Sequence, residues 1–361
     1  MRFALSDDQS AFRDAVRDLL AKECPPAVVR AAWEAPAGAL DRGVWDSLGA
    51  MGVLTLLMPE ADGGLGLDET FLVPILEECG RAALPHPIVE TAMVAAPLLG
   101  ADAGMVTTNL GGPNLPCAAD ADTLLLVVGD VLLRAPRDGV DLSPVTTVDR
   151  ARRAANVVTP ELVRQRHTEP VTATQASGVA GHSAEPVRQQ HTEPVAATQA
   201  SGVESAVFVT DDPTTIALAV DRGALGTAAM LVGLGQAMLD LTVGYAKERQ
   251  QFGVPIGSFQ AVKHHLADAA LALEFARPAV WRAGWSVAHD EPTRTRDVSM
   301  AKAMASDAAE LVGRKALQCH GAIGYTVEAD LHLYLKRTWA LARASGDSAH
   351  HTDRVAEALG T

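Results

Sequence analysis

The segment Tyr245-Ala-Lys-Glu-Arg-Gln-Gln-Phe-Gly-Val-Pro-Ile-Gly-Ser-Phe-Gln260 joins two long helical patterns through a cationic turn that is rich in glycine. Later in the chain, Gln318-Cys-His-Gly-Ala-Ile-Gly-Tyr-Thr326 forms a second glycine-containing turn. The guanidinium of Arg249 at a helix end suits bidentate contact with a pyrophosphate, and glycines let the backbone approach a ligand closely. The two turns therefore predict a site for a phosphate-rich cofactor. Taken alone, an arginine at a helix end is most often a partner of the helix dipole.

The residues around these turns predict long helices. Before the first turn, apolar and small residues recur at steps of three and four and mark one buried face: Leu225, Ala228, Val232, Gly235, Leu239 and Val243. Further helices are expected at about 258–289 and 295–319, and a fourth begins near Thr326. That fourth helix carries a stripe of Leu331, Tyr334, Leu335 and Trp339. Four long helices joined by short turns predict an antiparallel bundle over 221–361.

The first 104 residues predict an N-terminal helical domain. Helices are expected at 4–22, 44–51 and 67–82, and a short one ends near Gly100. Ser6 and Gln9 have the spacing of a capping box at the first of these helices.

Residues 105–220 predict a small middle β domain. The runs 123–128 and 131–134 indicate a hairpin with Gly129-Asp130 at its turn, and 207–210 and 216–220 are also expected to be strands. The overall fold class is therefore α+β, mostly α.

An internal duplication interrupts this domain. Residues 163–179 recur with two substitutions as 187–203, at a period of 24 residues. Their Thr, Gln, Ser, Gly and Pro content predicts a solvated insertion or a disordered loop. A partner-docking segment is the alternative interpretation.

Composition excludes several classes of function. A net charge of −14 argues against nucleic acid as a ligand, while local arginines and helix N-termini can still bind an anion. The four cysteines form no CxxC pair, and adjacent histidines such as His264-His265 and His350-His351 are poorly placed to bind one metal ion. We expect no metal site, no membrane-spanning segment, no signal peptide and a cytoplasmic location.

The two glycine turns, together with Pro59-Glu60 and Gly63-Gly64-Leu-Gly66, resemble the acyl-CoA dehydrogenase family of flavoenzymes. The likeness extends over 221–354 and much of the N-terminal block. It implies a helical domain, a small β-barrel-like middle domain and a four-helix bundle that enclose FAD and assemble into dimers and tetramers. By this resemblance, five residues are expected to contact the FAD of a neighbouring subunit: Arg249, Gln251, Phe252, Gln318 and Gly321.

The same resemblance exposes a missing group. In this family a glutamate removes the α proton of an acyl-CoA thioester while the β hydride passes to the flavin. The two positions where that glutamate occurs correspond here to Gly223 and Ser345, and neither residue is a carboxylate. Asp221 and Asp347 are the nearest acids, but a two-residue offset on a helix turns a side chain by about 200°. A helix N-cap for Asp221 and a solvated turn for Asp347 are the alternative interpretations, which leaves the two acids weak candidates for the base.

The middle domain shows a second departure. The family's Thr-Glu-Pro…Gly-Ser-Asp segment has no counterpart in 101–160. The triplets within His167-Thr-Glu-Pro170 and His191-Thr-Glu-Pro194 lie in the duplicated tract and lack the Gly-Ser-Asp part. They are therefore interpreted as coincidental.

Three functions follow from this pattern. The first is a non-catalytic subunit that pairs with a glutamate-bearing dehydrogenase chain and helps to bind its FAD, as in heteromeric family members acting on steroid side-chain CoA esters. The second is a self-sufficient FAD-dependent acyl-CoA dehydrogenase with an unrecognised base, in a homo-oligomer. The third is a flavin-free scaffold. The missing glutamates and the altered middle domain favour the first.

Overall fold

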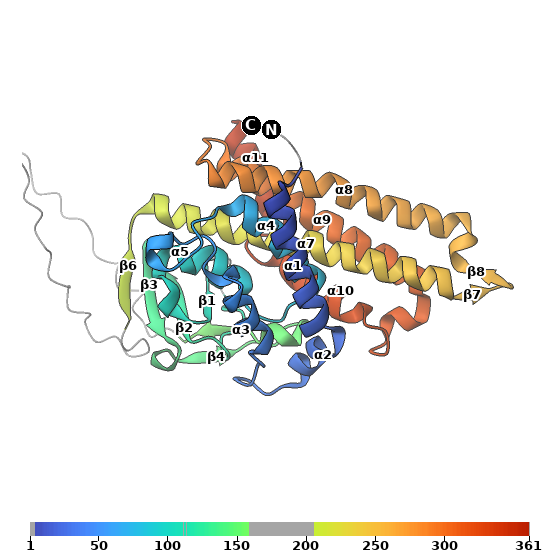
Figure 1. Cartoon of the computed structure of the whole chain (residues 1–361), viewed down its shortest axis with the longest axis horizontal. Helices are drawn as coiled ribbons and strands as arrows, with labels where there is room; N and C mark the ends of the chain where they lie inside the picture. Colours follow the sequence, from blue (N-terminus) through green and yellow to red (C-terminus); the bar gives the residue numbers. More distant parts are fainter. Residues whose placement is uncertain (1–3, 111, 113, 159–205, 361) are drawn as a thin grey trace, which may run out of the picture.

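The computed structural model describes residues 4–110, 112, 114–158 and 206–360. The duplicated tract at 163–203 lies outside these residues. Within them, an N-terminal helical block, a small sheet and a long helical bundle follow one another along the chain (Figure 1). This order confirms the predicted mostly helical α+β fold.

The N-terminal block has six helical segments. They are α1 (Asp7–Glu23), α2 (Pro26–Glu34), α3 (Gly43–Ala50), α4 (Glu69–Arg81), the π-helical segment η3 (Val89–Ala95) and α5 (Ala96–Leu99). The capping box is present at α1, where Ser6 Oγ accepts from the Gln9 amide and Gln9 Oε1 accepts from the Ser6 amide. Helix α2 was not predicted. It begins at Pro26 directly after Pro25, and proline is tolerated in a first helical turn, where its missing N–H is not needed.

The middle block contains a four-stranded sheet in the order β1-β2-β3-β6. Its strands are β1 (Val106–Thr108), β2 (Thr123–Val128), β3 (Val131–Pro136) and β6 (Val207–Thr210), while β4 (Leu142–Pro144) pairs with β5 (Ala155–Val157). The predicted hairpin is correct, because Val128 pairs with Val131 across Gly129-Asp130. Gly129 takes a φ of +60°, which favours glycine at the first turn position.

One expected strand is wrong. Residues 216–220 lie inside α7 (Pro213–Glu248), which begins before the predicted bundle boundary at 221. Asp212 caps this helix by accepting hydrogen bonds from the amides of Thr214 and Thr215, and Pro213 occupies its first position. These start signals outweigh the short alternation of apolar residues in 216–220.

Of the remaining helices, the first three pack against α7 and the last one packs against α9. They are α8 (Gln260–Ala288), α9 (Arg294–His320), α10 (Leu331–Arg343) and α11 (Ser348–Leu359). A two-stranded hairpin of β7 (Gln250–Gln251) and β8 (Val254–Pro255) projects beyond the bundle at the end opposite the sheet (Figure 1). Helix α10 begins later than predicted, because Gly321–Tyr325 forms a 3₁₀ turn first.

The other single-turn 3₁₀ helices are Val53–Thr55, Glu60–Asp62, Ala101–Ala103, Arg137–Gly139, η6 (Arg150–Arg152) and Ile256–Ser258.

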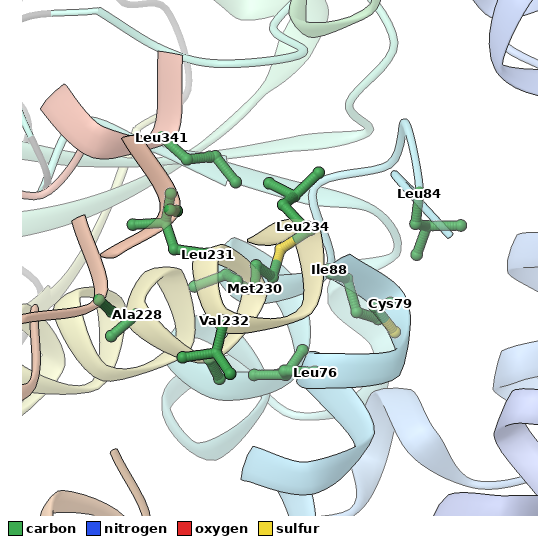
Figure 2. Close-up of a cluster of buried hydrophobic side chains, with 14 of the residues drawn as sticks. Leu76, Cys79, Leu84, Ile88, Ala228, Met230, Leu231, Val232, Leu234 and Leu341 are labelled. Carbon is green, nitrogen blue, oxygen red and sulfur yellow. The ribbon is translucent and has the colours of Figure 1, made fainter. Parts of the chain in front are cut away.

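The main core lies where α4, α7 and α10 meet. Figure 2 shows this cluster of buried apolar side chains, which includes Leu76, Met230 and Leu341. Helices α4 and α7 cross closely, because a Cβ on Gly233 would lie 1.8 Å from the carbonyl oxygen of Glu77. Helix α7 is long and apolar enough to cross a membrane by length and composition, but 67% of its most apolar window is buried inside the protein. That burial is typical of a core helix.

Candidate functional site

A cavity of about 310 Å³ lies between the bundle and the β block. Its walls come from η3, from the region around β1, from η6, from α7 and from the end of α10. Most of the wall is apolar, including Val94, Leu110, Val220 and Trp339. A cavity of this size and polarity is suited to an acyl group.

Both positions where the resemblance places a glutamate line this cavity. Gly223 lies on α7 and Ser345 follows α10, yet a Cβ on Gly223 would lie only 3.8 Å from Ser345 Oγ. Thr227, one turn further along α7, donates its hydroxyl to the Gly223 carbonyl at 2.8 Å and lies 3.4 Å from Ser345 Oγ. This part of the wall therefore presents two hydroxyls and a glycine in place of a carboxylate.

The loop that carries Ser345 is held by two buried basic side chains, His351 and Lys302. Ser345 has a φ of +55°, in the left-handed region that is unfavourable for most side chains. Its carbonyl oxygen accepts a hydrogen bond of 2.7 Å from His351 Nε2. Lys302, which is fully buried, donates to the carbonyls of Ala342 and Gly346 at 3.1 and 2.9 Å. The position of Ser345 is thus fixed from two sides.

Burial controls the charge of both groups. It lowers the pKa of the Lys302 ammonium to about 7 and the pKa of the His351 imidazole to about 4. His351 is therefore neutral at neutral pH. It contacts the carbonyl of Ser345, so among the described residues no histidine is bonded to the Ser345 hydroxyl.

Asp221 lies in a buried ion network, away from the residues that line the cavity. Its side chain is fully buried inside α7, so it does not cap a helix N-terminus. It accepts hydrogen bonds from Arg294 at 3.1 Å, from Thr295 at 2.8 Å and from Arg354 at 2.9 Å. These contacts give it a structural role that sequence periodicity did not indicate.

Asp347 caps the N-terminus of α11. Its carboxylate accepts a hydrogen bond from the amide of His350 at 2.9 Å, and this bond is the largest cause of a lowered pKa. A carboxyl group with a lowered pKa is a poor proton acceptor. Asp347 is not among the described residues that line the cavity.

Among the described residues that line the cavity, Glu90 is the only carboxylate. It lies at the start of η3, and Arg152 of η6 approaches its Oε1 to 3.6 Å. Sequence reasoning missed this pair, because it joins segments about sixty residues apart and neither has a motif. The signal that points to Glu90 comes from the structure: the residue lies in the π-helical segment Val89–Ala95, and π-helical turns occur frequently at functional sites.

The residues of the first glycine turn lie at the opposite end of α7. Arg249 is exposed at the C-cap of the helix, and the β7–β8 hairpin follows it. Phe252 at the hairpin tip is 93% exposed, with a φ of +53°. Among the described residues, the Arg249 side chain has no hydrogen bond or ion pair. Gln251 is exposed as well.

The second glycine turn lies beside the first. Tyr245 near the end of α7 stacks on His320 at the end of α9, with ring centroids 4.4 Å apart. Gln318 and Gly321 are exposed on this end of α9, and Gly321 has a φ of +64°. The structure therefore brings together the two turns that the sequence analysis grouped.

The cavity and the hairpin are far apart within one chain. Twenty-five residues of α7 separate Gly223 from Glu248. At a rise of about 1.5 Å per residue, the two ends lie about 37 Å apart. The cavity and the hairpin are therefore separate parts of this chain.

The hairpin end presents groups that suit a phosphate-rich ligand with an aromatic ring. An unpaired guanidinium, an exposed aromatic ring and a glycine turn offer contacts to phosphate and to a flat ring. A hollow beside the hairpin is lined by three acidic residues, Asp240, Glu248 and Asp330. Arg81 also lines this hollow, but it is paired with Asp240 at 2.7 Å. Phosphates are therefore expected on the outer, Arg249 side of the hairpin.

Comparison with known proteins identifies the family. Models of the acyl-CoA dehydrogenase N-terminal and C-terminal domains match residues 6–102 and 214–360. Acyl-CoA dehydrogenase IpdE2 of Mycobacterium tuberculosis is 30% identical, with 93% of this chain and 92% of that protein covered. IpdE2 of Mycolicibacterium smegmatis is 29% identical, with 97% and 98% covered. The chain belongs to the acyl-CoA dehydrogenase family.

A solved structure shows the same fold. The ChsE4–ChsE5 complex of Mycobacterium tuberculosis matches with a TM-score of 0.78 at 20% identity, covering 100% of this chain and 99% of that one. Members of this family are FAD-binding oxidoreductases of fatty acid and steroid β-oxidation.

Proposed function

We propose that this protein is a subunit of an oligomeric, FAD-dependent acyl-CoA dehydrogenase that desaturates an acyl-CoA thioester between its α and β carbons. In this proposal the chain lacks a catalytic base of its own. It pairs with a glutamate-bearing dehydrogenase chain, and Arg249, Gln251, Phe252, Gln318 and Gly321 contact the FAD held at the interface. A cytoplasmic location is part of the same proposal.

One observation carries the proposal. Gly223 and Ser345 line the same cavity wall, so both usual locations of the base are occupied by groups that cannot take the α proton. A serine hydroxyl becomes reactive only when a neighbouring base accepts its proton. The histidine near Ser345 is bonded to its carbonyl instead.

The chain's own residues would therefore bind and orient rather than transfer protons. When bound, FAD supplies the acceptor for the β hydride. The Arg249 guanidinium would pair with its phosphates, and the Phe252 ring would cover an aromatic ring of the cofactor. The separation of about 37 Å between hairpin and cavity supports a cofactor shared between two chains.

The pairing of unlike chains has a structural precedent. The ChsE4–ChsE5 complex is named for two different components, and its fold matches this chain throughout. In an assembly of two unlike chains, one chain can supply the catalytic glutamate and the other can contribute FAD contacts. The exposed hairpin of this chain, and the lack of a glutamate at Gly223 and Ser345, suit the second role.

The test is flavin content and turnover. We expect the protein purified alone to carry little FAD. Co-expression with a glutamate-bearing acyl-CoA dehydrogenase chain from the same genome should yield one FAD per pair, measured by flavin absorbance against protein concentration. A homo-oligomer of this chain with full flavin occupancy and turnover on an acyl-CoA would overturn the proposal.

Glu90 favours a second candidate function, a self-sufficient dehydrogenase. Its carboxylate lines the cavity and is the one acid there among the described residues. Arg152 weakens this alternative, because it lies 3.6 Å from the same carboxylate and makes Glu90 part of an ion pair. Turnover by the isolated chain that is lost in Glu90→Gln would establish it.

A further inference from the structure

Arg152 is a cavity-lining arginine with unused hydrogen-bond capacity. Its side chain is only 16% exposed, and its nearest ionic partner is Glu90 Oε1 at 3.6 Å. Among the described residues the guanidinium makes no hydrogen bond. A guanidinium carries five N–H donors, so those of Arg152 are available to a molecule bound in the cavity.

The adjacent arginine shows what a structural role looks like. Arg153 donates to Asp120 at 3.0 Å and to the carbonyls of Pro36 and Ala32 at 2.8 Å each. These contacts tie the β block to α2 and the chain that follows it. Arg152 contributes no comparable contact, so packing alone does not explain why its charge is buried.

Glu90 is similarly underused. Its carboxylate is 16% exposed, and its contact with Arg152 is longer than a hydrogen bond. Removing both charges from water is expensive, and at this distance their attraction does not include the hydrogen bonds that would offset the cost. The pair therefore leaves a donor and an acceptor available at the cavity wall.

The pair is continuous with the wall that carries the base positions. Thr227 lines the main cavity and also the small adjoining hollow that contains Glu90 and Arg152. Thr227 in turn lies 3.4 Å from Ser345 Oγ. Glu90, Arg152 and Thr227 thus form a polar corner within an otherwise mainly apolar cavity.

We infer that the Glu90–Arg152 pair is a recognition subsite for an uncharged oxygen substituent, a hydroxyl or a ketone, on the acyl chain of a bound CoA thioester. Arg152 donates to the substituent oxygen, and a hydroxyl substituent also donates to Glu90. A plain hydrocarbon chain leaves the Arg152 donors unmatched, and a terminal carboxylate that approaches Arg152 is opposed by the like charge of Glu90. This inference rests on the proposed acyl-CoA substrate but not on the absence of a catalytic base.

The experiment compares three thioesters of equal length by calorimetry on the full chain, alone and in its flavin-containing complex. The probes are octanoyl-CoA, ω-hydroxyoctanoyl-CoA and suberyl-CoA, which ends in a carboxylate. A site built to bond a hydroxyl strongly rejects the analogue that lacks it. We expect the hydroxylated probe to bind at least about tenfold more tightly than octanoyl-CoA, and suberyl-CoA more weakly than the hydroxylated probe.

Two variants locate the preference. Arg152→Met keeps the length of the side chain and should reduce the ratio between hydroxylated and plain probes to about one. Glu90→Gln removes the negative charge and should improve suberyl-CoA binding relative to the wild type. Arg150→Met is the matched control, because Arg150 is exposed in the same turn and should leave all three affinities unchanged. Circular dichroism and unfolding curves check that each variant is folded.

The outcomes separate this inference from the proposed function. Equal affinities of the wild type for hydroxylated and plain probes would overturn the subsite, whatever the flavin content. A preference that survives in Arg152→Met would do the same. A Glu90→Gln variant that binds octanoyl-CoA normally but abolishes turnover by the isolated chain would identify Glu90 as a base. That result would overturn both the recognition role and the non-catalytic assignment.

Discussion

The two ends of α7 differ in how much of their chemistry is satisfied within the chain. At the cavity end, Ser345 is held by His351, and Lys302 fixes the carbonyls on either side of it. At the hairpin end, Arg249 and Phe252 extend from the bundle without a side-chain partner among the described residues. The contrast favours the proposal that the hairpin contacts another subunit, whereas the Ser345 loop is held by groups of its own chain.

The two ends of α7 also differ in how closely their residues resemble the family. By the resemblance to the family, Arg249, Gln251 and Phe252 at the hairpin end match the FAD-contacting positions, while Gly223 and Ser345 at the cavity end stand where a glutamate is expected. A residue that serves a neighbouring active site is needed even when the chain does no chemistry of its own. This difference can be tested by perturbing each end separately.

The largest effect is expected at Asp221, which holds the cavity end of α7 to α9 and α11. Asp221→Ala leaves Arg294 and Arg354 without their buried anion, so we expect a loss of about 3–5 kcal/mol in the free energy of unfolding. Urea denaturation measures the change. Asp240→Ala is the matched control on the same helix.

The control loses an exposed ion pair and one exposed hydrogen bond, which Gln236 donates to Asp240 at 3.0 Å. Asp240 and Arg81 are each 43% exposed, so Asp240→Ala should cost no more than about 1 kcal/mol. Similar losses for the two variants would show that the buried network does not stabilise the fold as its geometry indicates. A folded Asp221→Ala that lost only turnover would revive Asp221 as a base.

The second largest effect is expected on FAD binding, at the hairpin end. Arg249→Ala should weaken FAD binding to the assembled complex by on the order of 2–5 kcal/mol, if its pair with phosphate is buried there. The free energy of unfolding of the chain alone should change by less than about 0.5 kcal/mol, because the side chain is exposed and unpaired. Equilibrium dialysis of the flavin and urea denaturation measure the two quantities.

Lys247→Ala provides the control for this variant. It removes one exposed positive charge two residues away and should retain FAD affinity. Equal flavin retention in wild type and Arg249→Ala would reduce Arg249 to a partner of the helix dipole. A large loss of folding stability would show that it has contacts within the chain.

Sequence reasoning found the hairpin end because its signals are local. The helical periodicity, the Arg249 helix end and the glycines of both turns lie within short windows, and Tyr245 and His320 confirm that the turns meet. The bundle and the Gly129-Asp130 hairpin were predictable for the same reason. The FAD contacts and the domain boundaries themselves stay predictions.

The polar part of the cavity could not be found in this way. Glu90 and Arg152 come from an N-terminal segment and a β-block turn, and only tertiary packing brings them together. Asp221 was misinterpreted as a helix cap because the Asp212-Pro213 start signal lies further back. Its three partners come from α9 and α11, which no local pattern links to it.

A pH effect is expected at the cavity end. The folded pKa of His351 is about 4, below its ordinary value of 6.5, because burial disfavours the charged form. Between these values the unfolded chain binds more protons, so the contribution of His351 to stability is lost as pH falls from about 6.5 to 4, by up to about 1.4 kcal/mol per pH unit. His351→Gln removes this titration. The difference in stability between wild type and variant should therefore shrink over that range.

The comparison with the variant isolates His351 from other buried groups. Burial also lowers the pKa of His86 to about 4, while it raises the pKa of Glu77 to about 7, which gives a slope of opposite sign. Both groups are present in wild type and variant and cancel in the difference. A difference that is constant from pH 6.5 to 4 would contradict the pKa shift at His351.

The smallest effect is expected at Gly223, and it tests whether the backbone forbids a side chain at a base position. A Cβ there would meet Val94 and Ser345 at 3.7 and 3.8 Å, which are ordinary contacts. Gly223→Ala should therefore stabilise the protein by about 0.5–1 kcal/mol, the usual gain in a helix interior. Gly233→Ala, whose Cβ would clash with the Glu77 carbonyl, should instead be destabilising. If denaturation curves show both variants destabilised, crowding explains Gly223. The expected opposite signs would mean that the helix tolerates a Cβ at this position, so crowding of the backbone does not explain the glycine.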